Sequence, residues 1–113
     1  MELAELSRRA MEIRTRYAAL ERARHGRSWT TEEIALGFVG DVGDLMKLIM
    51  AANGVRDIPE AQDKLAHELA HELADCLWCV LVLSHLHGVD LEGAFVRTMD
   101  EIEARITEIQ GEM

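Results

Sequence analysis

The chain has 113 residues, 49% of them hydrophobic, and its 21 acidic and 12 basic residues give a formal net charge of −9. This length predicts a single domain over residues 1–113, and the apolar content indicates that another subunit covers part of the surface. Nucleic-acid polymers and anionic membranes need clustered Lys and Arg, so the acidic balance argues against both as partners. It does not exclude a nucleotide, because a bound metal ion can offset phosphate charge.

The N-terminal segment carries charges throughout and lacks the apolar region of a secretory signal. The longest unbroken apolar run, from Cys76 to Leu83, is too short to span a bilayer. We therefore expect a cytoplasmic protein. Cys76 and Cys79 form a C-x-x-C inside this run, without a second pair for zinc or a redox-type turn, and are predicted to be core cysteines.

One proline and a nearly unbroken 3.6-residue periodicity predict an all-α fold with four helices. The first helix is expected over about residues 2–24, and its apolar seam packs either within the domain or across a dimer. Thr30 and Glu33 form a capping box that opens the second helix, which runs to about Asn53.

The third helix is expected to follow a short loop, Val55–Ile58, with Pro59 in its first turn, and to end before Gly88. Asp90 caps the fourth helix, which carries one apolar stripe: Leu91, Phe95, Met99, Ile102, Ile106 and Ile109. We expect a four-helix bundle, completed by oligomerisation, in which the second and third helices are adjacent and antiparallel.

Two acidic pairs interrupt this pattern, Asp41 with Asp44 and Glu72 with Asp75. Their i, i+3 spacing places both carboxylates of a pair on one face of a helix, one turn apart. Asp41 falls on the apolar stripe of the second helix, which comprises Ile34, Phe38, Leu45, Leu48 and Ala52. Glu72 falls on the stripe of the third helix, which comprises Leu65, Leu69, Cys76, Cys79 and Leu83.

A carboxylate on a buried stripe is costly unless it is paired or bound to a cation, and four converging carboxylates also repel one another. Lys47 and Lys64 are the only lysines, so basic partners are scarce. We therefore expect Mg²⁺ or Mn²⁺, which take oxygen ligands and leave positions for water and phosphate. The alternative is that the acids lie at the edges of amphipathic faces and reach solvent.

Three glycines, Gly37, Gly40 and Gly43, flank the first acidic pair. Each weakens a helix by up to about 1 kcal/mol relative to alanine. The expected return is close approach of a neighbouring helix or a ligand to the backbone.

Two segments, ALGFVGDVGDL and LAHELADCLWCVLVLSHLHGVDLEGAFVRTMDEIEAR, together resemble the MazG-like all-alpha nucleoside triphosphate pyrophosphohydrolases. Within that family they are most similar to the small dCTP pyrophosphatase branch. The family pattern E-x-x-E followed by E-x-x-D reads here Asp41-x-x-Asp44 and Glu72-x-x-Asp75. The resemblance extends from about Trp29 to Arg105.

The resemblance implies hydrolysis of a (deoxy)nucleoside triphosphate to the monophosphate and pyrophosphate by a homodimer or homotetramer. It implies that Asp41, Asp44, Glu72 and Asp75 hold Mg²⁺, with Mn²⁺ able to substitute. One of these acids, or Glu68 one turn earlier, would accept a proton from the attacking water. Glu72 and Glu68 are the catalytic candidates, and the sequence does not choose between them.

Several positions depart from the family pattern or remain open. Aspartates replace both glutamates of the first pair, so each carboxylate reaches one methylene less far. Lys47 stands where relatives often carry an acid, and either contacts phosphate or is solvated. Asp100 and Arg105 match family positions for substrate binding, but Ile102 and Glu103 replace polar or basic residues nearby, so Asp100 is alternatively a solvated acid.

Two tryptophans are candidates for the substrate pocket. Trp29 aligns with a ring that stacks on the base in the dCTP-specific branch, and its flat apolar face suits that role; alternatively it packs as a lid over the helix end. Trp78 lies one turn beyond Asp75 and lines either the pocket or the core.

Two other readings compete with the hydrolase. Glu68 and His71 form an E-x-x-H, which is half of a di-iron carboxylate site, but the chain lacks a second one. His67 and His71 lack further ligands and are expected to be solvated or hydrogen-bonded. The remaining alternative is a non-catalytic helical dimerisation module or an inactive family member.

Overall fold

A computed structural model describes residues 2–54 and 62–113, and in this part of the chain it contains four α-helices. They are α1 (Leu3–His25), α2 (Thr31–Ala52), α3 (Gln62–Leu86) and α4 (Leu91–Glu112). The all-α prediction and the order of the helices are confirmed. The predicted loop at 55–58 and the placement of Pro59 lie outside the described residues.

The ends of the helices follow local sequence signals. The Thr30 hydroxyl accepts a hydrogen bond from the Glu33 backbone N–H at 3.2 Å, and the Glu33 carboxylate accepts one from the Thr30 N–H at 3.1 Å, which confirms the capping box. Asp90 accepts a bond from the Gly93 N–H at the start of α4. Gly26 and Gly88 have φ angles of 78° and 67°, the left-handed conformation that ends helices.

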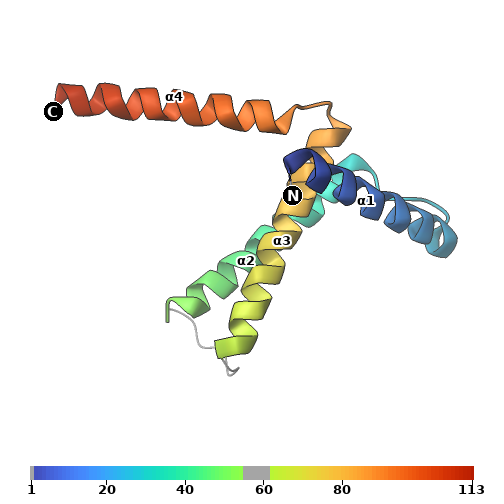
Figure 1. Ribbon diagram of the computed structural model, residues 1–113. Helices are drawn as coiled ribbons and strands as arrows, with labels where there is room; N and C mark the ends of the chain where they lie inside the picture. The colour runs from blue at the N-terminus through green and yellow to red at the C-terminus, as the bar shows by residue number, and fades with distance from the viewer. Residues whose placement is uncertain (1, 55–61) are drawn as a thin grey trace.

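α3 is the central helix and packs against both α1 and α2. Figure 1 shows α2 and α3 side by side and antiparallel, with α1 crossing near the C-terminal half of α3. The hydrophobic core lies where these three helices meet and is formed by Ala10, Ile34, Leu81 and Val82. The core is small, and Leu77 on the apolar half of α3 remains 45% exposed.

The segment of α3 from Lys64 to Leu86 is long and apolar enough, by length and composition alone, to cross a membrane. Within one chain 17% of its apolar window is buried, and Cys79, Leu81 and Val82 are the buried residues of this segment. The same segment carries Glu68, Glu72 and Asp75. We therefore interpret α3 as a core helix.

α4 extends away from the other three helices (Figure 1) and contains no buried residue. Its apolar stripe is open, with Phe95 60%, Ile102 46% and Ile106 50% exposed. One chain therefore does not close a bundle around α4, and completion by oligomerisation stays a prediction.

The capping box can be tested through the titration of Glu33. The Arg27 guanidinium, 2.6 and 3.0 Å from the Glu33 oxygens, and then the Thr30 N–H lower the pKa of Glu33 to about 2. A carboxyl group whose pKa is lowered by folding stabilises the native state at pH values above its unfolded-state pKa. This stabilisation is lost as the pH falls toward the folded-state pKa. We expect Glu33→Gln to lower the thermal midpoint at pH 7, with the difference shrinking between about pH 4.5 and 2. Glu32→Gln, in the same turn, should show no such trend by circular dichroism.

Candidate metal centre and adjoining groove

Three of the four predicted acids come together between α2 and α3. Asp41, Glu72 and Asp75 each offer one carboxylate oxygen, and these oxygens lie within 4.8 Å of one another. All three side chains are half-buried. The two acidic faces inferred from the sequence therefore meet, and we call Asp41, Glu72 and Asp75 the acidic cluster.

Asp44 lies one turn further along α2 and is exposed, outside the acidic cluster. Its charge nevertheless acts on Glu72. A side chain on the rim of the cluster can join a cation only by reaching inward, so the role of Asp44 as a ligand stays a prediction.

Glu72 has the least favourable environment of the cluster. Its Oε2 atom is buried and has no hydrogen-bond partner among residues 2–54 and 62–113. Burial first, and then the charges of Asp75, Asp41 and Asp44, raise the pKa of Glu72. A desolvated oxygen with no donor, surrounded by other carboxylates, fits a hard divalent cation, which would supply the missing positive charge.

The two cysteines are free thiols beside the cluster. The Cys79 thiol donates to Asp41 Oδ2 at 3.6 Å, and burial, followed by this hydrogen bond, raises the pKa of Cys79 to about 12. Burial also raises the pKa of Cys76. The raised pKa values favour the protonated form of both thiols near neutral pH. Cys79 is buried, as predicted for a core cysteine, whereas Cys76 is half-buried. The contact of Cys79 with Asp41 was not predicted.

A cavity of about 340 Å³ adjoins Glu72 and is lined by Leu48, His67, Glu68, His71 and Glu72. Glu68, which the sequence suggested as a proton acceptor, thus shares a cavity with a member of the cluster. The half-buried Glu68 carboxylate lies 3.9 Å from Lys64 Nζ, and His71 Nε2 lies 3.2 Å from Asp75 Oδ2.

A larger groove of about 590 Å³ adjoins the cluster on the side of Asp41 and Asp75. Its volume falls in the range of about 300–1,000 Å³ that is usual for small-molecule sites. Three aromatic side chains line it: Tyr17 from α1, Trp29 from the α1–α2 connection, and Trp78 from α3. The groove and the cluster therefore form one continuous site with an acidic side and an aromatic side.

α1 contributes residues to this groove that the sequence did not identify. Arg14, Tyr17 and Glu21 line it, and their spacing of three and then four residues along the chain places them on one face of α1. That spacing was a readable signal, but Tyr17 was assigned only to the apolar seam of the first helix.

The two tryptophans have different surroundings. Trp78 Nε1 donates to the Ala10 carbonyl at 3.2 Å, and its ring meets Tyr17 edge-on at 6.1 Å, so Trp78 belongs to the core margin as well as the groove. Trp29 is 47% exposed, and its ring lies 3.4 Å from where a Cβ on Gly37 would be. Gly40 and Gly43 have open space beside them.

The remaining predicted substrate residues lie outside the groove in this chain. Lys47 is exposed on α2 and does not line the groove. Asp100 and Arg105 are exposed on α4, which leads away from α2 and α3 (Figure 1). Their substrate-binding roles stay predictions.

Residues 29–109 match the MazG nucleotide pyrophosphohydrolase domain. The chain belongs to the MazG family. Comparisons with curated proteins and with solved structures gave no match. The MazG match includes the acidic cluster and Trp29, whereas α1 precedes it. Assignment to the dCTP pyrophosphatase branch stays a prediction.

We expect one substitution in the acidic cluster to change the thermal midpoint in opposite directions with and without metal. In chelator, Glu72→Gln should raise the thermal midpoint by a few degrees, because it removes a desolvated charge from among like charges. In excess Mg²⁺ or Mn²⁺ the order should reverse, since ligand at about 100 times its Kd adds about 2.7 kcal/mol to the native state. Differential scanning fluorimetry would check this, with Glu12→Gln, an exposed acid on α1, as the control.

Proposed function

We propose that this MazG-family protein acts in the cytoplasm as a metal-dependent hydrolase that converts a (deoxy)nucleoside triphosphate to the monophosphate and pyrophosphate. Asp41, Glu72 and Asp75 would hold Mg²⁺ or Mn²⁺, with Asp44 as an additional ligand. One observation carries the proposal: the unpartnered Glu72 oxygen lies among like charges beside a groove of nucleoside size.

The residues of the site suggest a division of tasks. When bound, the metal ion neutralises phosphate charge and lowers the pKa of a water molecule. Asp41 and Asp75 belong to both the cluster and the groove, so a substrate with its phosphates at the cluster has its nucleoside beside the aromatic residues. Trp29 and Trp78 supply flat apolar surfaces for the base.

The attacking water needs a group to accept its proton. Glu68 and Glu72 line the same cavity, and Glu72 also belongs to the acidic cluster. We therefore assign metal binding to Glu72 and proton acceptance to Glu68, which lines the same cavity without belonging to the cluster.

Two substitutions distinguish the metal-binding role of Glu72 from the proton-accepting role of Glu68. Glu72→Gln should reduce pyrophosphate release by more than about 100-fold and abolish stabilisation by Mn²⁺, because loss of a ligand exceeds the 10- to 100-fold effect of losing a residue that supports one. Glu68→Gln should reduce release by about 10²- to 10⁴-fold, the usual range for a general base, but leave stabilisation by Mn²⁺ intact. A pyrophosphate-release assay over common and modified (d)NTPs measures the loss of activity in both variants, with Glu12→Gln as control.

If the folded wild-type protein releases no pyrophosphate from any nucleotide, it is an inactive family member or a dimerisation module.

We also propose that the protein works as a homo-oligomer in which the α4 stripe packs on a second copy. Five stripe residues are roughly half exposed: Phe95, Met99, Ile102, Ile106 and Ile109. Five residues on α2 and α3 are as exposed or more so: Leu36, Val39, Met46, Leu73 and Leu77. Together these side chains form an apolar surface that one chain leaves uncovered, and homodimer interfaces are the more apolar class of protein interface.

This assembly can be tested without disturbing the packing of a single chain. Ile106→Asp should convert the oligomer to monomers, because burying an unpaired carboxylate in the interface has a large unfavourable desolvation free energy. Light scattering after size-exclusion chromatography measures the change in mass. Thr107→Asp, which adds the same charge one position along α4, should leave the oligomer intact. A monomeric wild-type protein would overturn the proposal.

A further inference from the structure

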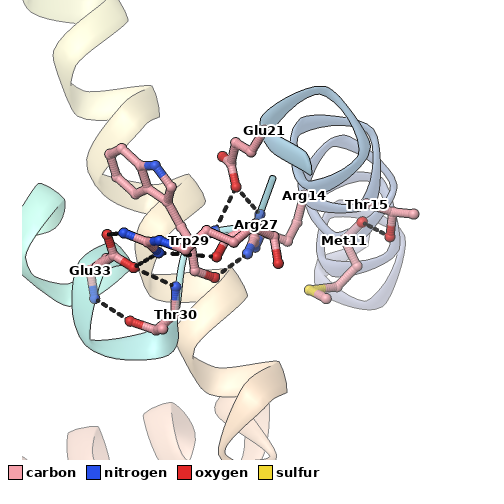
Figure 2. Close-up of polar contacts among 9 residues, drawn as sticks. Met11, Arg14, Thr15, Glu21, Arg27, Trp29, Thr30 and Glu33 are labelled. Carbon is pink, nitrogen blue, oxygen red and sulfur yellow. Dashed lines mark hydrogen bonds and ion pairs between the residues drawn. The ribbon is translucent and has the colours of Figure 1, made fainter. Parts of the chain in front are cut away.

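Trp29 is held by α1 through both of its backbone polar groups. Arg14 Nη2 donates to the Trp29 carbonyl at 2.6 Å, and Glu21 Oε1 accepts from the Trp29 N–H at 2.7 Å. The two side chains also contact each other, with Arg14 Nη1 3.3 Å from Glu21 Oε1. Figure 2 shows this network, in which Arg14 and Glu21 reach from α1 to the residue that precedes the cap of α2.

The Arg14–Glu21 pair is more enclosed than a surface ion pair. Its side chains are 11% and 18% exposed, compared with 64% and 33% for Arg27 and Glu33 in the neighbouring pair. Shielding from solvent strengthens such contacts and makes the loss of one partner costly to the other. The pair therefore fixes the Trp29 backbone more firmly than an exposed pair would.

The indole ring itself is left available. Trp29 is 47% exposed and lines the groove, while Thr30 and Glu33 fix the next residue as the start of α2. A ring on a connection between helices would ordinarily sample several orientations, which costs binding free energy when a ligand must order it. Here the chain is fixed on both sides of the Cα atom and one ring surface remains free.

We propose that Arg14 and Glu21 are positioning residues that hold the Trp29 indole as a preorganised wall for the nucleobase of the substrate. The inference rests on the proposed function, because it takes the groove to bind the nucleoside part of a nucleotide. Arg14 and Glu21 precede the MazG match at residues 29–109, so this support comes from a part of the chain that the match does not include.

Base positioning predicts an effect on KM rather than kcat. Arg14→Ala and Glu21→Gln should each raise KM for the preferred nucleoside triphosphate about tenfold, within the range for loss of one stacked aromatic ring. The turnover number kcat should change little, because neither residue belongs to the acidic cluster. Trp29→Ala should match them, and Trp29→Phe should retain most of the affinity. A fall in kcat at unchanged KM would overturn the proposal.

A charge swap separates positioning from simple stabilisation. Arg14→Glu combined with Glu21→Arg restores opposite charges, so the thermal midpoint should recover toward the wild-type value. The swapped pair faces the Trp29 carbonyl with a carboxylate and the Trp29 N–H with a guanidinium, so neither backbone hydrogen bond re-forms. KM should therefore stay raised, whereas its recovery in the double variant would show that the pair only stabilises the fold.

Binding without turnover keeps this inference distinct from the proposed hydrolysis. Nucleoside monophosphates of the four common bases, added in chelator, should quench indole fluorescence in the wild-type protein, and in Trp29→Phe the quenching should fall to the part that Trp78 contributes. Arg14→Ala should weaken the quenching about tenfold in concentration. This result without pyrophosphate release would support the Trp29 wall and reject the hydrolase, and absence of both signals would reject both proposals.

Discussion

The repulsion among carboxylates between α2 and α3 is the constraint on which the site depends. Asp41 and Glu72 occupy positions where apolar side chains would continue the stripes of their helices, and Asp75 joins them within 4.8 Å. The hydrophobic core cannot compensate locally, because its fully buried cluster lies with Ala10, Leu81 and Val82, toward α1 and the end of α3. Like charges placed inside a small protein destabilise the native state unless a cation neutralises them. The same arrangement therefore accounts for both a cost in the metal-free protein and a function in the metal-bound one.

The site is assembled from two parts of the chain with different roles. The part that matches the MazG domain supplies the acids, which can do phosphate chemistry for any nucleotide. α1 adds Tyr17 and the network around Trp29, which face the groove rather than the acids. The phosphates are the same in all nucleoside triphosphates, so protein groups that act on them do not discriminate between nucleotides. Protein groups around the base decide which nucleotide binds. Under the proposed function, selectivity would depend on α1 and its contacts with the α1–α2 connection.

Local patterns made most of the fold predictable, but contacts between distant segments were not. Periodicity gave the four helices, Thr30 and Asp90 gave their starts, and the position of Asp41 and Glu72 on apolar stripes indicated that the acids converge. The exposure of Asp44 was not foreseen, because i, i+3 spacing fixes a shared face but not which residue lies nearer the centre of the helix contact. The Arg14–Glu21 network was missed because ion-pair partners seven residues apart on α1 converge on a backbone group that only tertiary structure brings there. The direction of α4 also depends on the turn after Gly88 and on what covers its stripe, neither of which is encoded in helical periodicity.

The charge of the groove connects its chemistry with the position of α4. Among the described residues, three acids line it, Glu21, Asp41 and Asp75, against a single guanidinium, Arg14, which is already bonded to Glu21 and the Trp29 carbonyl. A triphosphate entering this field meets net repulsion, so positive charge must come from metal ions and from residues outside the groove. Arg97 and Arg105 lie on α4. This helix leads away from the acidic cluster of the same chain and exposes an apolar stripe (Figure 1). If α4 packs on a second copy, Arg105, which flanks the stripe, would lie beside the other molecule, whereas Arg97 is on the opposite face of α4. One assembly step would then cover the apolar area and bring at least one cation close to another copy.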